Sequence, residues 1–457
     1  MTQTVNTVAS QDLGAPPQIT KRQRARVITA STVGTTIEFY DFYVYATAAV
    51  AVFPHLFFPK SDNPTMALLS SFATFGLAFV ARPLGSIVFG HFGDVIGRKA
   101  SLVVALLTMG ISTFIIGCLP TYDTIGLWAP ALLALMRFGQ GLGLGGEWSG
   151  AALLATETAE DGKRARAAMW PQLGAPFGFL LANGLFLILV TVFNHQGGDI
   201  NSQFMAWGWR IPFLASAVMV AIGLYVRLRL DETPVFQQAV DQGKRVKSPL
   251  KEVFVTAWRP LICGTFVMVG CYTLFYLVTT WILSFGIGSR EKGVGLGIPY
   301  VDFLHLQLIS IFAFIIGIPV SGWLADRFGR KPTLAWTTAG IIVFSLTFTF
   351  FLSPAVATEN SVLAFLTVGM ALMGLIFGPM SAVLPEMFPT NVRYTGSGIA
   401  YNVASILGAA VAPFIATALA ASFGVSSVGW YLLVVSVVSL IAIMVMRESS
   451  DHDLTAI

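Results

Sequence analysis

Charged residues are scarce in this chain of 457 residues. Asp, Glu, Lys and Arg make up 11% of it and hydrophobic residues 55%, whereas soluble globular proteins hold roughly 25% charged residues. A soluble domain of this size could not bury so much apolar surface, so the composition excludes an ordinary cytosolic enzyme. The net charge of +4 is spread thinly along the chain, which excludes a nucleic-acid-binding protein.

Cysteine is also scarce, with three residues in the whole chain. Cys118, Cys263 and Cys271 all lie in apolar runs, and none stands at metal-ligand spacing from a histidine. We therefore expect packed thiols, with no disulfide, metal site or cofactor.

Long apolar runs are abundant instead. A membrane-spanning helix needs about 20 apolar residues, and we expect spans near 27–53, 66–91, 99–119, 126–155, 168–194, 209–230, 257–288, 303–325, 333–353, 362–385, 396–420 and 427–446. The predicted fold is an all-α polytopic membrane protein with 12 transmembrane helices. Of its 27 Lys and Arg residues, only Lys60, Arg210, Arg290 and Lys292 would lie outside if both termini are cytoplasmic, which favours that orientation.

The longest polar stretch lies at the middle of the chain and separates six spans from six others. The expected organisation is a cytoplasmic N-terminal tail (1–26), an N-terminal six-helix bundle (27–230), a cytoplasmic linker (231–256), a C-terminal six-helix bundle (257–446) and a cytoplasmic C-terminal tail (447–457).

The two halves carry matching motifs. GHFGDVIGRK at residues 90–99 corresponds to GWLADRFGRK at 322–331, and the Glu157/Arg164 pair corresponds to Glu386/Arg393. Two matches at nearly equal offset indicate an internal duplication, which is typical of secondary transporters.

Several further strings carry a family resemblance. They are IEFYDF at 37–42, ARPLG at 81–85, RFGQGLGLGGE at 137–147 and WGWRIPF at 207–213. Together with the duplicated loops, they resemble the metabolite:H⁺ symporter family of the major facilitator superfamily. The resemblance implies the two-bundle fold, a monomer, and a central cavity lined by spans 1, 4, 7 and 10, with 2, 5, 8 and 11 contributing. One departure is Val95, where the motif usually has a basic residue.

The repeated acidic and basic residues suggest a cytoplasmic gate. In the outward-facing state, the loop carboxylates would pair with arginines and helix ends across the seam between the bundles. The pairs would be partly exposed and individually weak, as a switch between balanced states requires. A plainer alternative is that the basic loops only fix the topology. The expected gate residues are Asp94, Arg98, Glu157, Arg164, Asp326, Arg330, Glu386 and Arg393.

Five ionisable residues lie deep within spans of the first half: Glu38, Asp41, Arg82, Arg137 and Glu147. Each would cost at least about 2.5 kcal/mol in lipid, so each should be paired or face the protein interior. Helical rise places Arg82 near the depth of Glu147, as a buried charge pair, and Asp41 within reach of Arg137.

The carboxylates of Glu38 and Asp41 are three residues apart and share one helical face. Their repulsion favours a proton on one of them, so we expect proton coupling at Asp41, helped by Glu38. Arg137 would alternate between Asp41 and a substrate carboxylate. The alternative is a static network that holds spans 1, 2 and 4 together.

Polar and aromatic residues of the cavity-lining spans are candidates for substrate contact. Beside Arg137, we expect Gln172, Tyr272, Tyr276 and Asn402 to bind substrate. Buried arginines favour an anionic or zwitterionic solute over a neutral sugar.

The predicted function is import of a small organic acid with protons, by rocker-switch alternating access, across a bacterial inner membrane. Osmolyte carriers such as those for proline or betaine are the first alternative. An uncoupled facilitator and a non-transporting receptor are weaker ones. The expected partners are the organic anion or zwitterion, protons and the lipid bilayer, with no nucleic acid. The sequence contains no arrangement of a nucleophile and a base that would predict an enzyme.

Overall fold

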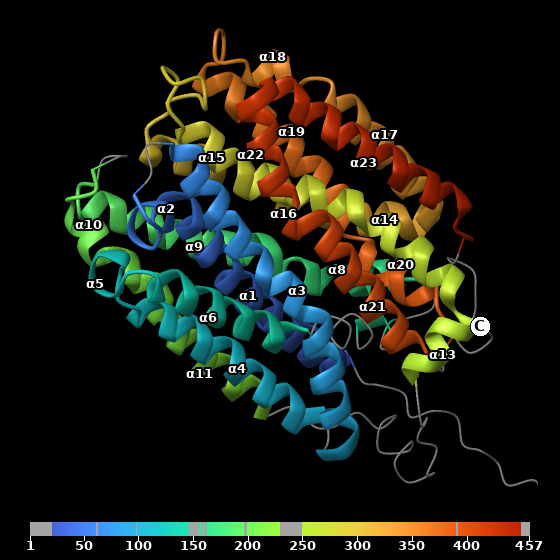
Figure 1. The fold of residues 1–457 in the computed structure, drawn as a ribbon. Coiled ribbons are helices and arrows are strands. Elements are labelled where there is room, and N and C mark those ends of the chain that lie inside the picture. Colours follow the sequence, from blue (N-terminus) through green and yellow to red (C-terminus); the bar gives the residue numbers. More distant parts are fainter. Residues whose placement is uncertain are drawn as a thin grey trace, which may run out of the picture.

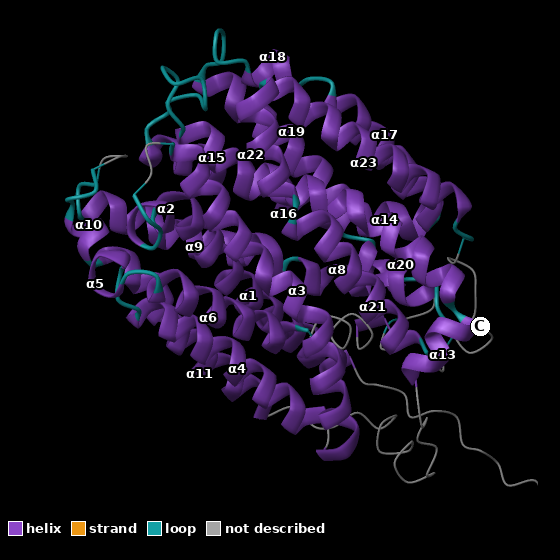
Figure 2. Cartoon of the chain, viewed as in Figure 1, coloured by secondary structure: helices purple, strands orange, loops and turns teal. Residues whose placement is uncertain are grey.

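A computed structural model provides the structure of this protein. It describes residues 21–60, 63–96, 98–145, 155–156, 159, 162–195, 199–228, 249–389 and 392–448. Two expected site residues, Glu147 and Glu157, lie outside these ranges, as does most of the expected linker. The side chains of Asp94 and Arg98 are likewise outside the description. The regular secondary structure of the described ranges is helical, with turns and loops between the helices, and no strand occurs in them (Figure 2).

The first half of the chain forms the helices that correspond to spans 1 to 6. In chain order they are α1 (Lys21–Ala51), α2 (Phe53–Leu56), α3 (Pro64–Ile96), α4 (Arg98–Cys118), α5 (Tyr122–Ile125), α6 (Trp128–Leu144), α8 (Arg164–Gln172), α9 (Gly174–Val192), α10 (Gln203–Ala206), the 3₁₀ turn η1 (Gly208–Arg210) and α11 (Ile211–Leu228).

The second half repeats this plan for spans 7 to 12. Its helices are α13 (Pro249–Thr256), α14 (Trp258–Tyr276), the π-helical turn η2 (Leu277–Trp281), α15 (Ile282–Ile287), α16 (Tyr300–Phe328), α17 (Arg330–Ser345), α18 (Phe348–Leu352), α19 (Glu359–Phe377), α20 (Met380–Glu386), α21 (Arg393–Ser405), the π-helical turn η3 (Ile406–Ala410), α22 (Ala412–Phe423) and α23 (Val425–Val445).

Among the described residues, eight helical segments are long and apolar enough to cross a membrane by length and composition. The other four expected spans coincide with α1, α4, α6 and α17. Boundaries differ from the prediction by several residues: α1 begins at Lys21, inside the expected tail, and span 9 divides into α17 and α18. The predicted all-α polytopic fold is confirmed.

The two halves of the chain form two bundles that lie side by side (Figure 1). Across the seam, α16 packs against α8 and α9, while α3 packs against α21, η3 and α22. We call the end of the bundles where α3 joins α4 and α16 joins α17 the basic end. The end that carries α2, α5, α10 and the segment 288–299 is the opposite end.

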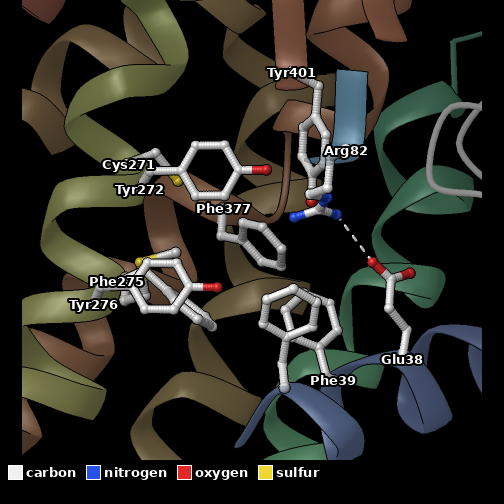
Figure 3. Close-up of a pocket in the computed structure, with 11 residues that line it drawn as sticks. Glu38, Phe39, Arg82, Cys271, Tyr272, Phe275, Tyr276, Phe377 and Tyr401 are labelled. Atoms are coloured by element: carbon white, nitrogen blue, oxygen red, sulfur yellow. Dashed lines mark hydrogen bonds and ion pairs between the residues drawn. The ribbon is translucent and has the colours of Figure 1, made fainter. Parts of the chain in front are cut away.

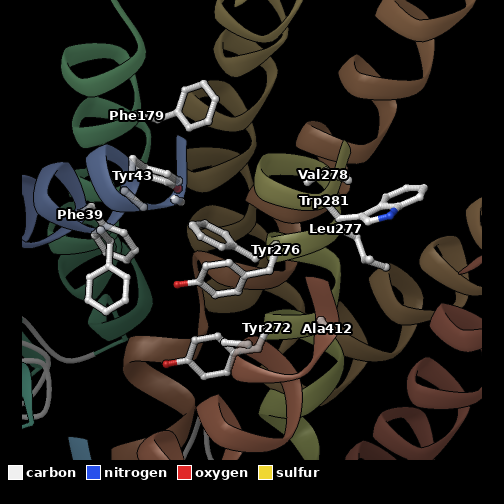
Figure 4. Packing of buried hydrophobic residues seen from close by; sticks show 14 of the residues in the cluster. Phe39, Tyr43, Phe179, Tyr272, Tyr276, Leu277, Val278, Trp281 and Ala412 are labelled. Carbon is white, nitrogen blue, oxygen red and sulfur yellow. The ribbon is translucent and has the colours of Figure 1, made fainter. Parts of the chain in front are cut away.

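Aromatic side chains fill the middle of the seam. The ring of Phe39 on α1 lies 6.0 Å from that of Phe275 on α14 and 6.2 Å from that of Phe377 on α19. Tyr43, one turn along α1, lies 5.9 Å from Phe275. Figure 4 shows Phe39, Tyr43 and Phe179 facing the tyrosines of the second bundle. The bundles therefore meet through an apolar layer.

Glycines allow α3 and α6 to approach closely. A Cβ atom at Gly85 would collide with the backbone of Leu142, and one at Gly141 would collide with the backbone of Ala78. Small residues at such positions are typical of membrane helix packing. This close approach fixes α3, and with it Arg82, against α6.

Candidate functional site

Four of the five ionisable residues expected deep within the spans are described, and all four are buried. Glu38, Asp41, Arg82 and Arg137 are between 0% and 3% exposed. They come from α1, α3 and α6, but they divide into two separate groups, each with its own hydrogen bonds.

The first group is an ion pair between Glu38 and Arg82. An Nη atom of Arg82 lies 3.0 Å from Oε1 of Glu38 and donates a hydrogen bond to it. The guanidinium also faces the rings of Phe42 and Tyr401, at 5.4 and 5.3 Å. Within the described part of the chain, Oε2 of Glu38 and Nε of Arg82 find no hydrogen-bond partner.

The sequence prediction pairs Arg82 with Glu147. Glu147 lies outside the described residues, so that pairing stays a prediction. Within the described part of the chain, the ion pair of Arg82 is with Glu38, a partner that depth along the spans alone did not single out.

The second group is centred on Asp41. Ser216 on α11 donates a hydrogen bond to Oδ1 at 2.9 Å, and Thr113 on α4 donates one to Oδ2 at 3.0 Å. Asp41 thereby joins α1 to α4 and α11 inside the first bundle. Both hydroxyl partners were missed from the sequence, although each is a polar residue inside an apolar span.

Arg137 reaches Asp41 only through other side chains. It donates to Oε1 of Gln140 at 2.9 Å and to the carbonyl oxygen of Phe75 at 3.2 Å. Gln140 in turn donates to Thr113 at 2.7 Å. Among the described residues no ion pair joins Arg137 to Asp41, so the direct contact expected from the sequence is replaced by a relay through Gln140 and Thr113.

A small pocket lies between the two bundles beside the first group. Figure 3 shows Glu38 and Arg82 on one side and the hydroxyls of Tyr272 and Tyr276 pointing toward them. The lining residues are Glu38, Phe39, Phe42, Arg82, Cys271, Tyr272, Phe275, Tyr276, Met373, Phe377 and Tyr401. The cavity volume is about 10 Å³, which is the room that about one water molecule needs. A solute can enter only if the bundles move apart.

The five expected substrate residues do not all line this pocket. Tyr272 and Tyr276 do, whereas Arg137, Gln172 and Asn402 do not. Gln172 donates across the seam to the carbonyl oxygen of Phe377 at 2.9 Å. Asn402 donates across it to Oγ of Ser86 at 2.8 Å. Gln172 and Asn402 therefore connect the bundles beside the pocket. Tyr401 lines it and was not among the five.

At the basic end, Asp326 connects the bundles. Its carboxylate accepts hydrogen bonds from the backbone N–H groups of Ala165 and Arg166 at the start of α8, both at 3.0 Å. Nη1 of Arg330 lies 3.1 Å from Oδ1 of Asp326, and Nη2 lies 3.1 Å from Oε1 of Glu386. We call Ala165, Arg166, Asp326, Arg330 and Glu386 the latch.

The latch is more buried than the sequence suggested. The side chains of Asp326, Arg330 and Glu386 are 1–2% exposed, and only Arg166 is open to solvent at 41%. Glu386 binds Arg330, while Nε of Arg393 donates to the carbonyl oxygen of Phe388 at 3.3 Å. Arg164 begins α8 beside the latch. Asp94, Arg98 and Glu157, which correspond to Asp326, Arg330 and Glu386, fall outside the described side chains.

Comparison with known proteins gives the family. The model of the Major Facilitator Superfamily matches residues 32–406 and 306–456. The chain belongs to the major facilitator superfamily. The "Inner membrane metabolite transport protein YhjE" of Escherichia coli (strain K12) is 53% identical over 433 residues, covering 94% of this chain and 96% of that protein. The chain described here is therefore a multi-pass membrane transporter of metabolites, and it is not an enzyme.

The names of more distant relatives state different solutes. The "Shikimate transporter" of Escherichia coli (strain K12) is 36% identical over 93% of this chain and 94% of its own. The "Proline/betaine transporter" of the same strain is 35% identical over 94% and 84%. A solved structure of XylE, the double Trp mutant, superposes with a TM-score of 0.69 at 18% identity, covering 95% of this major facilitator chain and 98% of that one. That likeness concerns the fold alone.

Proposed function

We propose that this protein is a proton-coupled symporter that imports a small organic acid by rocker-switch alternating access. The observation that carries the proposal is the Glu38–Arg82 ion pair in the wall of the pocket between the bundles. A carboxylate that neutralises an arginine can release it by taking up a proton. The arginine is then free to bind the carboxylate of a solute.

The same geometry supports an assignment of the proton site. The sequence suggests Asp41, helped by Glu38, but Glu38 lines the pocket and Asp41 does not. We therefore assign the coupling proton to Glu38 and the substrate carboxylate to Arg82. Asp41 and Arg137 hold α1, α4 and α6 in place through Thr113 and Gln140. In this assignment they position Glu38 without contacting the substrate.

Contacts on both sides of the pocket support alternating access. The latch joins the bundles at the basic end. At the opposite end, His195 of the first bundle lies against Tyr300 of the second, with the rings 6.4 Å apart. We propose that the two sets of contacts open in turn, and that the duplicated Asp94, Arg98, Glu157 and Arg164 contribute to the basic end as Asp326, Arg330, Glu386 and Arg393 do.

The orientation and location are part of the proposal. The excess of Lys and Arg supports a cytoplasmic basic end, with both termini on that side. The printed name of the YhjE relative supports the bacterial inner membrane. Since both bundles and the pocket belong to one chain, we propose that a monomer transports.

A second candidate function is proton-coupled uptake of a zwitterionic osmolyte. Aromatic rings attract ligand cations, and the pocket is walled by Phe and Tyr. The relative named for proline and betaine supports this candidate. The shikimate relative supports an acid, so only transport decides between them.

The test is proton entry into energised proteoliposomes when solutes are added, with organic acids and zwitterions in parallel. Proton entry with an acid is expected for the wild type and for Asp41→Asn, and its loss is expected for Glu38→Gln. Glu359→Gln, an exposed residue of α19, is the matched control. Loss in Asp41→Asn but not in Glu38→Gln would return the proton to Asp41. Proton entry with zwitterions only would establish the second candidate.

A further inference from the structure

We propose that Gln172 and Asn402 form a matched pair of uncharged clamps that close the pocket toward the basic end. Each residue donates a hydrogen bond to a backbone carbonyl of the other bundle. The inference rests on the proposed alternating access, but it requires neither a particular solute nor a coupled proton.

The first clamp runs from the first bundle to the second. Gln172 is the last residue of α8 and is 1% exposed, and its Nε2 donates a hydrogen bond at 2.9 Å to the carbonyl oxygen of Phe377. Phe377 is the last residue of α19, and carbonyl groups at a helix end have no partner within the helix. The amide of Gln172 therefore binds an acceptor at a helix end of the other bundle.

The second clamp runs in the reverse direction. Asn402 on α21 is 3% exposed, and its Nδ2 donates to Oγ of Ser86 at 2.8 Å and to the carbonyl oxygen of Gly145 at 3.3 Å. Gly145 follows the last residue of α6, and the hydroxyl of Ser86 on α3 donates to the same carbonyl. An amide of the second bundle thus binds a carbonyl at a helix end of the first.

The two clamps are equivalent by the internal duplication. The donors Gln172 and Asn402 belong to spans 5 and 11, and the acceptors Gly145 and Phe377 belong to spans 4 and 10. The two donors are separated along the sequence by nearly the same number of residues as the repeated loop motifs, and so are the two acceptors. Each half of the chain therefore supplies one amide and one carbonyl to a reciprocal pair.

The clamps lie between the pocket and the basic end. Phe377 lines the pocket, and so does Tyr401, the residue before Asn402 (Figure 3). On α3, Ser86 lies one turn nearer the basic end than Arg82, which lines the pocket as well. Helix α8 binds the latch in its first turn and carries the first clamp at its last residue. Opening of the basic end therefore has to break both clamps.

Hydrogen bonds without charge suit a contact that is made and broken in every cycle. Opening brings water to both the amide and the carbonyl, so each clamp contributes only as a hydrogen bond that is exchanged for bonds to water. Loss of one such bond raises the open population about three- to fivefold. Loss of two independent bonds raises it roughly tenfold or more.

Cys271 is a natural reporter of this opening. It lines the pocket, is 2% exposed and is one of three cysteines in the chain. In a Cys118→Ser/Cys263→Ser background, an anionic methanethiosulfonate reagent can modify only Cys271. The closed pocket has a volume of about 10 Å³, so the reagent enters only after the bundles separate. The modification rate of the purified full chain, without solute, therefore follows the open population even where that population is small.

The clamp variants are Gln172→Met and Asn402→Leu, which keep the approximate size of the side chain and remove the amide. We expect each variant to raise the modification rate of Cys271 about three- to fivefold, and the double variant to raise it roughly tenfold or more. Gln172→Asn keeps an amide on a shorter side chain that no longer reaches across the seam, so it should act as Gln172→Met does.

Two buried amides whose hydrogen bonds stay within one bundle supply the matched controls. Gln307 donates to the carbonyl oxygen of Thr279 at 2.9 Å in the second bundle. Asn183 accepts a hydrogen bond from Oγ1 of Thr47 at 2.7 Å in the first. Gln307→Met and Asn183→Leu make the same substitutions and should leave the modification rate unchanged. Equal increases in these controls, or an unchanged rate in the double clamp variant, would overturn the inference.

Spin labels identify the end that has opened, in a chain whose natural cysteines are replaced by serine. In the double clamp variant, we expect the distance between labels at Lys163 and Lys251, across the basic end, to widen. The distance between labels at Ile200 and Lys292, at the opposite end, should stay as it is without the clamp substitutions. Widening at the opposite end only would overturn the clamps and leave alternating access intact. Widening at both ends together would overturn alternating access itself, and the inference with it.

Discussion

Asp326 and Arg166 lie on different bundles. The carboxylate of Asp326 accepts a hydrogen bond from the backbone N–H of Arg166 at 3.0 Å, and Nε of the Arg166 side chain lies 3.7 Å from the same carboxylate. A carboxylate at the N-terminus of α8 is also favoured by the helix dipole. Arg330 holds that carboxylate from its own bundle at 3.1 Å. Asp326 thus accepts hydrogen bonds from a helix end and forms ion pairs with Arg166 across the seam and with Arg330 beside it.

The first prediction concerns this contact. Asp326→Asn removes the charge that the start of α8 and Arg166 bind, so we expect the basic end to open. Hydrogen bonds to charged groups contribute about 1.5–3 kcal/mol, so the open population should rise at least about tenfold. Spin labels at Lys163 and Lys251 would report the distance across the basic end. Asp302→Asn, on the exposed side of α16, is the control, and an unchanged distance distribution in Asp326→Asn would rule the latch out.

The second prediction separates stability from transport at the Glu38–Arg82 pair. Arg82→Met alone leaves Glu38 buried without its partner, which should lower the free energy of unfolding by about 3–5 kcal/mol. Adding Glu38→Gln removes the unpaired charge and should recover most of that loss. Thermal unfolding in detergent measures the stability, and proteoliposome uptake measures transport.

The double variant should remain inactive in transport. A double variant that is stable and still couples uptake to protons would show that the pair is structural. No recovery of stability in the double variant would show that the two residues do not form an isolated pair.

The third prediction concerns pH at the opposite end. His195 is 5% exposed, its Nδ1 lies 2.7 Å from Oγ of Ser202, and its ring packs on Phe204 of its own bundle and Tyr300 of the other. Burial lowers the pKa of His195, His55 lowers that pKa further, and the carboxylate of Asp199 opposes the shift. The closed contact therefore favours neutral His195.

Opening would expose His195 to water and return its pKa toward about 6.5. Above that pH both states are neutral and pH has no effect, whereas below it the open state binds the proton more readily. Acidification below about pH 6.5 should therefore open this end, which spin labels at Ile200 and Lys292 would report. His195→Gln should abolish the pH response and Tyr300→Phe should keep it. A response that persists in His195→Gln would assign it to another group.

The fourth prediction concerns the close approach of α3 and α6. Gly141→Ala places a methyl group against the backbone of Ala78, so we expect a loss of about 1–3 kcal/mol from overpacking. Gly184→Ala on α9 is the matched control because a Cβ there meets nothing within 4 Å. Thermal unfolding of the two variants would measure the difference. Equal unfolding temperatures would mean that α3 and α6 can separate without cost.

Much of this architecture could be predicted from the sequence alone. The cost of burying charge and of leaving backbone groups unpaired in lipid makes apolar runs into spanning helices, so composition and run length gave the spans, and the repeated loops gave the two halves. The same cost made Glu38, Asp41, Arg82 and Arg137 candidates for a site, because a charge persists inside a span only where the protein binds it.

Only the tertiary structure decided how these residues are combined. Depth along a span follows from sequence position, but the direction of a side chain depends on helix rotation, which packing against neighbouring helices sets. That rotation places Arg82 in an ion pair with Glu38. It also leaves Thr113 and Gln140 between Asp41 and Arg137. It also directs Tyr401 into the pocket and Gln172 and Asn402 across the seam. The sequence by itself determined which residues must find partners, and the packing of the two bundles determined which partners they found.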